Sequence, residues 1–300
     1  MRVLICDKTE NESINQMRAA GLTVDTNFEI TPEELMSIGK NYEVLVVRSR
    51  TKVRQPLIDV CPNLKLIVRG GVGLDTIDVD YARSKGIVVK NTPLASSASV
   101  AELAIGYMFM LARSLYRASA TMKAEKWEKK SFEGDELGGK MLGLIGVGNI
   151  GKETARRAVA LGMHVIAYDP YVTVFDYGEL ITLDELLARS DYISLHLPKT
   201  DETANMISHE QFAKMKDGVR IINCARGGIV DEEALYQALE NGKVAGAALD
   251  VFAVEPPTDW KLIKHEKVIA SPHIGAATRE AQGRVGAEVA QIVIDFAKQA

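Results

Sequence analysis

Polar and ionisable side chains follow apolar runs in the second half of this sequence. They are Asp169, His196, Cys224, Arg226, Asp250, Ser271 and His273. If the runs are strands of one parallel sheet, these side chains share its carboxyl edge, where ligands bind. Histidine accepts a proton near neutral pH, arginine binds a carboxylate and polarises a carbonyl, and a carboxylate stabilises a protonated histidine. Such a set suits proton transfer at a hydroxyl or carbonyl group, although every strand must end at something polar.

Two of the five histidines are candidates for the proton-transferring base. His196 and His273 both follow strand-like runs, whereas His164 begins one, and His209 and His265 lie in helical or loop patterns. His273 is favoured because the glycine and alanines that follow it within four residues allow a ligand to approach closely.

The choice of arginine and carboxylate is left more open by the sequence. Arg226 precedes Gly227 and Gly228, a flexible turn that would let the backbone approach a cofactor. An arginine at a strand end can equally be a surface ion-pair partner. Glu255 lies in a loop before two prolines, and its spacing alone does not select it.

A glycine-rich turn follows the apolar run 141–145. Gly146, Gly148 and Gly151 form the G-x-G-x-x-G pattern. The first glycine permits a tight turn, the second admits a pyrophosphate, and the third lets helix and strand pack closely. The next run ends at Asp169, at about the twenty-residue offset where an acid binds ribose hydroxyls. A carboxylate there repels a 2′-phosphate, so NAD is the predicted cofactor; the alternative is that Asp169 only begins a turn.

A basic segment follows an earlier apolar run. Arg48, Arg50, Lys52 and Arg54 alternate with uncharged residues, so in an extended chain they would share one face. Together with Arg69, after the next run, they could receive a substrate phosphate; the alternative is a solvated basic face. A charge-assisted contact is worth about 1.5–3 kcal/mol, enough to influence substrate preference.

The elements that would position these residues alternate between strand and helix patterns. In the first ninety residues, apolar runs rich in β-branched residues predict strands at 3–6, 44–47, 66–68 and 87–89. Thr31, Pro32 and Glu34 predict a capped helix start. A nearly all-apolar helix is expected over 99–113, buried in the fold or against a second subunit.

A second alternating series begins at Met141. It predicts strands at 141–145, 164–168, 192–195, 219–223, 245–249 and 268–270, with capping boxes beginning at Thr182 and Ser208. Six parallel strands with intervening helices make a doubly wound sheet. With a last helix over 278–298, the sequence predicts the α/β fold class.

Composition argues against several classes of function. A net charge of −4 gives no electrostatic case for a nucleic-acid or membrane partner. No apolar run approaches the roughly 20 residues that cross a bilayer, and the N-terminus resembles a buried strand rather than a signal peptide. Cys6, Cys61 and Cys224 lack metal-ligand spacing, so no metal is expected, and scattered thiols favour a cytoplasmic protein.

Motifs across nearly the whole chain resemble the D-isomer-specific 2-hydroxyacid dehydrogenase family. They span residues 69–75, 91–93, 143–151, 168–170, 195–198, 223–228, 249–252 and 272–276. The resemblance implies two Rossmann/flavodoxin-like parallel-sheet domains with an active-site cleft between them. Within the family, the segment 272–282 is most similar to the D-3-phosphoglycerate dehydrogenases.

The resemblance implies roles that spacing does not settle. His273 would be the acid/base, Glu255 would pair with it and raise its pKa, and Arg226 would bind the substrate carboxylate and carbonyl oxygen. The implied substrate-binding residues are Arg48, Arg69, Gly70, Gly71 and Val72. Beyond the glycine turn and Asp169, the implied NAD contacts are Val72, Asn149, Ile150, His196, Leu197, Pro198, Cys224, Ala225, Arg226, Asp250, His273, Ile274, Gly275 and Ala276.

The resemblance also implies a domain organisation. Residues 1–94 with 281–300 would form a discontinuous substrate-binding domain and residues 95–280 the NAD-binding domain, with hinge closure excluding water. Homodimers are usual in the family, with the helix 99–113 at the interface. The chain departs from many phosphoglycerate dehydrogenases by ending at Ala300, so a regulatory domain that responds to serine is not expected, and the segment 169–182 looks shortened.

The predicted reaction is therefore the NAD-dependent oxidation of D-3-phosphoglycerate to 3-phosphohydroxypyruvate, the first step of serine biosynthesis. Its small-molecule substrate would lose a hydride from carbon 2. An alternative in the same family is a glyoxylate or hydroxypyruvate reductase, or another D-2-hydroxyacid dehydrogenase. A distant alternative is an NAD-sensing, corepressor-like binding protein, because a fold does not dictate its function.

Overall fold

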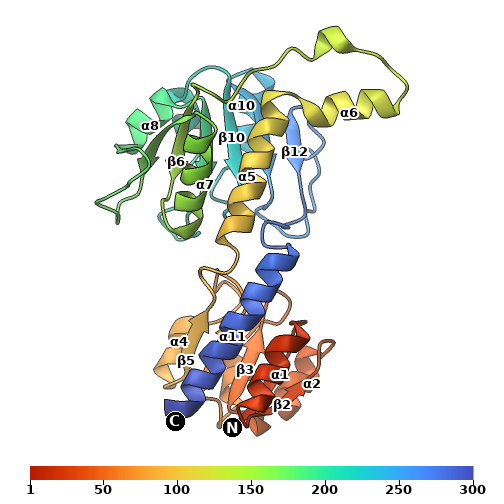
Figure 1. The fold of residues 1–300 in the computed structure, drawn as a ribbon, viewed down its shortest axis with the longest axis vertical. Coiled ribbons are helices and arrows are strands. Elements are labelled where there is room, and N and C mark those ends of the chain that lie inside the picture. Colours follow the sequence, from red (N-terminus) through yellow and green to blue (C-terminus); the bar gives the residue numbers. More distant parts are fainter. Residues whose placement is uncertain (300) are drawn as a thin grey trace. The chain divides into compact units, whose positions relative to one another are not determined.

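The computed structural model describes residues 1–299, which divide into two compact units. Unit 1 comprises Met1–Ser96 and the C-terminal segment from Ala276, and unit 2 comprises Ser97–Gly275. Each unit is built on its own parallel sheet with helices on both faces (Figure 1). The sequence analysis puts the corresponding divisions at residues 94 and 280.

Unit 1 holds a five-stranded sheet in the order β2-β1-β3-β4-β5, with all neighbours parallel. Its elements are β1 (Arg2–Ile5), α1 (Asn11–Ala19), β2 (Thr23–Thr26), α2 (Pro32–Ile38), the 3-10 helix η1 (Gly39–Asn41), β3 (Val44–Val47), α3 (Gln55–Asp59), β4 (Leu66–Arg69), α4 (Val79–Ser84), β5 (Val88–Asn91) and α11 (Arg279–Gln299). All four residues of β3 are buried valines or leucine, because a central parallel strand is covered on both faces.

Two apolar clusters hold the sheet of unit 1. On one face, Met17 of α1 and Val289 of α11 pack with Val3 and Val44 of the sheet. The other cluster joins the strands to apolar side chains of α2, α3 and α4, among them Leu35. The last helix of the chain thus completes the first unit.

Unit 2 holds a seven-stranded sheet in the order β12-β11-β10-β9-β6-β7-β8. Its elements are α5 (Ser97–Ala112), α6 (Leu115–Lys123), the 3-10 helix η2 (Lys129–Ser131), β6 (Met141–Ile145), α7 (Asn149–Ala160), β7 (His164–Tyr168), β8 (Glu179–Leu180), α8 (Leu183–Arg189), β9 (Tyr192–Leu195), α9 (His209–Lys214), β10 (Val219–Asn223), α10 (Glu232–Glu240), β11 (Val244–Leu249) and β12 (Val268–Ala270). Side chains of α8, α9 and α10 belong to one core cluster, and those of α5 and α7 belong to the other.

The predicted strands agree closely with the structure, except at two sheet edges. The bounds of β3, β6, β7, β9, β10 and β12 are those predicted; β4 and β11 differ by one residue at one end, and β1 and β5 differ by one or two residues at both ends. The sequence analysis missed β2 and β8, so its six-stranded sheet for unit 2 is wrong by one strand. Only one residue of β2 is buried and β8 has two residues, so neither carries a clear apolar pattern.

The predicted helix starts are confirmed by their capping contacts. Oγ1 of Thr31 accepts a hydrogen bond from the Glu34 N–H at 3.1 Å, and Glu34 accepts from the Thr31 N–H at 3.3 Å. The same reciprocal pair occurs at Thr182, and Gln211 accepts from the Ser208 N–H at 3.2 Å. These caps fix where α2, α8 and α9 begin.

Helix α5 is buried along most of its length within unit 2, where it packs on α7, β10 and β11. It begins two residues before the predicted start at residue 99 and ends one residue before the predicted end at residue 113. Helix α6 has no buried residue and extends away from the sheet (Figure 1). No single helix among residues 1–299 is long and apolar enough to span a membrane; α5 and α6 meet the limits only as a pair bent by 66°.

Candidate active site

The polar residues singled out in the second half of the sequence do lie at one edge of a sheet. The strands of unit 2 are all parallel, so their carboxyl ends share that edge. The residues that follow the strands are Gly146 after β6, Asp169 after β7, His196 after β9, Cys224 after β10, Asp250 after β11 and Ser271 after β12.

The glycine turn between β6 and α7 combines a folding role with a binding role. Gly146 has φ +90°, and a Cβ there would lie 2.5 Å from the carbonyl oxygen of His196. A Cβ on Gly151 would collide with the carbonyl oxygen of Gly146. Gly148 is different, because φ is −64° and, apart from its neighbours in the chain, no described atom lies within 4 Å of the position its Cβ would take. Its small size leaves room for a group outside the chain.

Helix α7 begins directly after this turn with Gly148 at its N-cap. Glycine has no side chain to accept hydrogen bonds from the first N–H groups of the helix, and this end carries the positive pole of the helix dipole. Helix N-termini of this kind bind phosphate groups. The open space at Gly148 and the uncapped helix start therefore fit the pyrophosphate of a dinucleotide.

Asp169 is tied to the same turn. Its Oδ2 accepts from the Val147 N–H at 3.0 Å, and its Oδ1 accepts from the Tyr171 N–H at 3.0 Å. An ionised carboxylate offers about four acceptor positions, so both oxygens keep a lone pair for further donors. The carboxylate thus fits the hydroxyl groups of a ribose, and its charge disfavours a 2′-phosphate.

His273 and Glu255 form a hydrogen-bonded pair. Nδ1 of His273 lies 2.7 Å from Oε2 of Glu255, whose Oε1 accepts from the Phe252 N–H at 3.1 Å. When Glu255 is ionised it can only accept, which assigns the proton of a neutral ring to Nδ1 and leaves Nε2 as an acceptor. The side chains are 49% and 36% exposed, which leaves them accessible to a small molecule. His273 has φ +53°, a left-handed conformation that the sequence does not reveal.

Asp250 holds the loop that carries His273. This buried carboxylate accepts from the N–H groups of Ile274 at 2.8 Å and Gly275 at 2.7 Å, and also from the Ser271 hydroxyl. A Cβ on Gly275 would lie 3.0 Å from Oδ2 of Asp250, so the close approach favours glycine. Asp250 therefore shapes the loop, in addition to the cofactor contact predicted for it.

Arg226 lies on the turn after β10, beside the loop that carries Glu255. Nδ2 of Asn223 donates to the Arg226 carbonyl oxygen at 3.0 Å and closes the turn. A Cβ on Gly227 would collide with the Phe252 carbonyl group, so the two loops are in backbone contact. The half-buried Arg226 side chain is thus brought to the same sheet edge as the His273–Glu255 pair.

His196 is placed less well for proton transfer. Its Nε2 lies 2.9 Å from Oγ of Ser194, and its Nδ1 is buried with no hydrogen-bond partner among the described residues. Burial lowers the pKa of His196 to about 4, so the ring is neutral near pH 7. The geometry favours His273 over His196 as the base.

Arg48 and Arg69 lie at neighbouring strand ends in unit 1. Val47, the last residue of β3, is the register partner of Arg69 on β4, and Arg48 follows directly. A Cβ on Gly70 would lie 3.4 Å from the Arg48 side chain, and one on Gly71 would meet the Arg69 guanidinium. The two cations therefore flank the same pair of glycines.

The hydrogen bonds of the Arg48 side chain go to neutral groups. It donates to the Gln282 amide oxygen and to the Lys8 carbonyl oxygen at 3.3 Å, and no carboxylate in residues 1–299 lies within ion-pair distance of it. The Arg48 guanidinium is therefore not neutralised by an ion pair and can bind an anion.

Val72 is also predicted to bind substrate. Its carbonyl oxygen accepts a hydrogen bond from Nδ2 of Asn91 at 2.5 Å.

The expectation that the basic residues at 48–54 share one extended face is wrong. The chain bends after Arg48, because the buried Asp7 carboxylate accepts from the backbone N–H of Arg48 and from Nε of Arg50 at 3.1 Å. Arg54 pairs instead with Asp78 at 2.7 Å. The sequence analysis did not single out Asp7, although its position directly after the first apolar run is the same signal used for the other strand ends.

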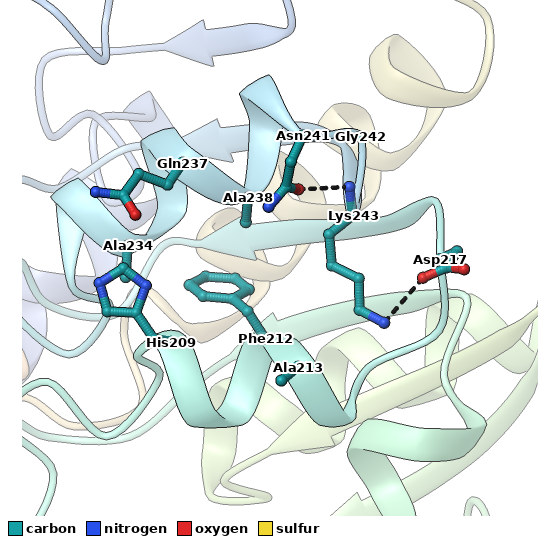
Figure 2. A pocket seen from close by; sticks show the side chains of 10 residues that line it. All are labelled: His209, Phe212, Ala213, Asp217, Ala234, Gln237, Ala238, Asn241, Gly242 and Lys243. Atoms are coloured by element: carbon teal, nitrogen blue, oxygen red, sulfur yellow. Dashed lines mark hydrogen bonds and ion pairs between the residues drawn. The ribbon is translucent and has the colours of Figure 1, made fainter.

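A groove of about 520 Å³ in unit 2 lies away from these residues. It is lined by α9, α10 and the residues before β10 and β11, where Asp217 and Lys243 form an ion pair at 2.9 Å (Figure 2). The groove therefore lies at the amino edge of the sheet, opposite the edge where open parallel sheets bind ligands. Among residues 1–299, no group of three His, Cys, Asp or Glu side chains is arranged to hold a metal ion.

The fold and these contacts define a class of protein, the dinucleotide-dependent oxidoreductases. A doubly wound sheet carries an open glycine turn, an acid at the end of the next strand, and a histidine–carboxylate pair at the same edge.

Comparison with known proteins is more specific. Residues 105–275 match the family described as "D-isomer specific 2-hydroxyacid dehydrogenase, NAD binding domain". The chain is 51% identical to a hydroxypyruvate reductase of Thermotoga maritima, over 97% of this chain and 96% of that protein. It is 48% identical to a D-3-phosphoglycerate dehydrogenase of Archaeoglobus fulgidus, over 99% of this chain but 58% of that protein. A D-lactate dehydrogenase from Aquifex aeolicus, crystallised with NAD and lactic acid, is 34% identical with a TM-score of 0.85, covering 100% of this chain and 96% of that one.

The chain therefore belongs to the D-isomer-specific 2-hydroxyacid dehydrogenase family. It is an oxidoreductase with an NAD-binding domain, which confirms the predicted fold class, enzyme class and cofactor. Because the chain spans little more than half of the phosphoglycerate dehydrogenase from A. fulgidus, the substrate does not follow from that relative.

Proposed function

We propose that the chain oxidises D-3-phosphoglycerate to 3-phosphohydroxypyruvate while NAD is reduced to NADH. The reaction removes a hydride from carbon 2 and a proton from the hydroxyl group on that carbon. The observation that carries this proposal is the 2.7 Å contact between Nδ1 of His273 and Glu255, which leaves Nε2 of His273 able to accept the hydroxyl proton.

The protein residues have distinct roles in this reaction. His273 accepts the hydroxyl proton and returns it in the reverse direction, a contribution typically worth about 10²–10⁴ in rate. Glu255 orients the ring and stabilises its protonated form. Arg226 binds the substrate carboxylate and stabilises the partial negative charge on the oxygen at carbon 2.

NAD supplies the acceptor for the hydride when it is bound. The pyrophosphate would be held at Gly148 and the start of α7, and a ribose would be held by Asp169. The remaining contacts proposed are those implied by the family resemblance, at the strand ends of unit 2 and at Val72.

Arg48 and Arg69 are the proposed ligands of the substrate phosphate. They flank Gly70 and Gly71, and Arg48 has no carboxylate partner in the described part of the chain. An arginine is suited to this role because its planar guanidinium presents several donors to phosphate oxygens.

A second candidate is the reduction of hydroxypyruvate, the same three-carbon acid without the phosphate. Two observations favour it. The relative named hydroxypyruvate reductase is matched over almost its full length, and Arg50 and Arg54 are engaged by Asp7 and Asp78 rather than grouped for a phosphate.

Steady-state kinetics with NADH separates the two candidates. We expect kcat/KM for 3-phosphohydroxypyruvate to exceed that for hydroxypyruvate and glyoxylate by at least about tenfold, as expected for one or two charge-assisted contacts. Equal values would contradict the phosphate assignment and support the second candidate. The same panel with NADPH should show much weaker activity because of Asp169.

We further propose that the chain forms a homodimer, with the exposed side of α5 and α6 at the interface. Phe109, Leu115, Met122 and Trp127 are all exposed apolar side chains in this region, and Trp127 is 78% exposed. Large apolar groups gathered on an extended element indicate a surface that is covered by a partner. Because homodimers are usual in the family, we propose that the partner is a second copy of this chain.

A further inference from the structure

Tyr107, in the middle of α5, is linked by hydrogen bonds to the loop that carries His273. Its hydroxyl lies within hydrogen-bond distance of Oγ of Ser271, and the Ser271 hydroxyl donates to Oδ1 of Asp250. We propose that Tyr107 and Ser271 are positioning residues that hold His273 in place through Asp250. This inference rests on the proposed role of His273 as the acid/base.

The direction of each hydrogen bond follows from the number of protons available. A serine hydroxyl carries one proton, and Ser271 donates it to Asp250. Tyr107 must therefore be the donor in its contact with Ser271. The hydrogen bonds therefore run in one direction, from the Tyr107 hydroxyl of α5 to Ser271 and from Ser271 to the Asp250 carboxylate.

Asp250 links these two hydroxyl donors to the chain segments before and after His273. Ser271 lies two residues before His273, while Ile274 and Gly275, whose N–H groups donate to Asp250, follow it directly. His273 thus has its left-handed backbone conformation between two anchored segments. A non-glycine residue in this conformation persists where its surroundings over-determine it.

Within residues 1–299, the contact with Ser271 is the one hydrogen bond recorded for the Tyr107 hydroxyl. The side chain is 3% exposed in an apolar cluster of unit 2, where a phenylalanine ring would pack equally well. Its helix also packs against α7, which begins at the glycine turn. The hydroxyl therefore joins the His273 loop to a helix that lies against the dinucleotide-binding element.

Removing the donors should disturb proton transfer more than cofactor binding, since NAD has many other proposed contacts. We expect Tyr107→Phe to lower kcat about three- to tenfold and Ser271→Ala to lower it about tenfold, the effect of losing one buried hydrogen bond. Ser271→Thr keeps the hydroxyl and should restore kcat to within about twofold of wild type. The Kd for NADH, measured by fluorescence, should stay within about threefold in all three variants.

Tyr116→Phe is a matched control, because Tyr116 donates to the Glu266 carbonyl oxygen at 2.8 Å, outside the site. Its kcat should stay within about twofold of wild type. The positioning role is overturned if either Tyr107→Phe or Ser271→Ala keeps full kcat, or if Ser271→Thr is as impaired as Ser271→Ala. If Ser271→Ala does not fold, Tyr107→Phe alone decides.

Measuring His273→Ala in parallel separates this inference from the proposed function. An inactive His273→Ala beside a fully active Tyr107→Phe overturns the positioning role and leaves the acid/base role intact. A fully active His273→Ala overturns both. An inactive His273→Ala with the graded losses given above supports both.

Discussion

Two histidines stand at the same sheet edge, and their surroundings give them different chemistry. His273 is half-exposed, is oriented by Glu255, and keeps Nε2 as an acceptor. His196 has a buried Nδ1 and a pKa lowered to about 4 by burial. A base must reach the substrate and keep a nitrogen able to accept its proton, and the exposed, oriented ring of His273 provides both.

The lowered pKa of His196, whose Nδ1 is buried, predicts how stability depends on pH. The unfolded chain binds a proton at this ring below about pH 6.5, but the folded chain does so only near pH 4. This contribution to stability is fully present above pH 6.5 and is lost as the pH falls toward 4, by at most about 3 kcal/mol. In urea unfolding, His196→Gln should therefore lose less stability than wild type over this interval.

The exposed His164 provides the control for that experiment. His164→Gln should follow the wild-type stability curve between pH 7 and 4. A wild-type curve that runs parallel to that of His196→Gln would show that burial does not hold this ring neutral.

The charge of Arg48 should matter for one substrate and not for the other. Arg48→Met keeps the length of the side chain but removes the charge, and should lower kcat/KM for 3-phosphohydroxypyruvate about ten- to a hundredfold. Activity on hydroxypyruvate should change by less than about threefold. Arg54→Met, in the same segment but paired with Asp78, should leave both values nearly unchanged. Equal losses of kcat/KM on both substrates would show that Arg48 does not bind the substrate phosphate.

At the scale of elements, the turn from β6 into α7 predicts that alanine substitutions at two of its glycines have different effects, one on stability and the other on cofactor binding. Gly151→Ala places a methyl group against the Gly146 carbonyl oxygen and should destabilise the fold by about 1–3 kcal/mol. Gly148→Ala meets no described atom, so the protein should unfold at nearly the wild-type temperature, while the Kd for NADH rises about tenfold or more. Thermal unfolding and NADH titration measure the two effects. Unchanged NADH affinity in Gly148→Ala would place the pyrophosphate elsewhere.

The sequence predicts the central elements well for a physical reason. Strands such as β6, β9 and β10 are largely buried on both faces, so they appear as mostly apolar runs that stop where the sheet edge begins. The polar residue at each stop is then a candidate for the site. The edge strands β2 and β8 lack this signal, because β2 has only one buried residue and β8 has two residues, so the sequence predicts neither.

Other parts of the site depend on tertiary contacts that no local pattern encodes. The bend after Arg48 is caused by Asp7, which is 41 positions away in the chain. Tyr107 looks like any apolar residue of α5, and its partner Ser271 is 164 positions distant. The role of Glu255 follows from the family resemblance and not from its spacing, and the structure supplies its contact with His273.

For the whole molecule, we predict a dimer in solution. Sedimentation equilibrium should give twice the chain mass, and a double variant with Met122→Glu and Trp127→Glu should give the mass of one chain, because charges at exposed apolar positions oppose their burial. Val174→Glu changes an equally exposed apolar residue of the β7–β8 connection and should remain dimeric. A dimer that persists in the double variant would place the interface elsewhere.

The central claim is that hydride leaves carbon 2 of a D-2-hydroxy acid while His273 takes the hydroxyl proton. The most direct measurement follows deuterium from C2-deuterated D-3-phosphoglycerate or D-glycerate into the reduced cofactor by mass spectrometry. We predict that wild type forms deuterated NADH from the D isomer, and that His273→Ala does so at least about a hundredfold more slowly. Deuterium absent from the NADH, or transfer by His273→Ala at the wild-type rate, would contradict the claim.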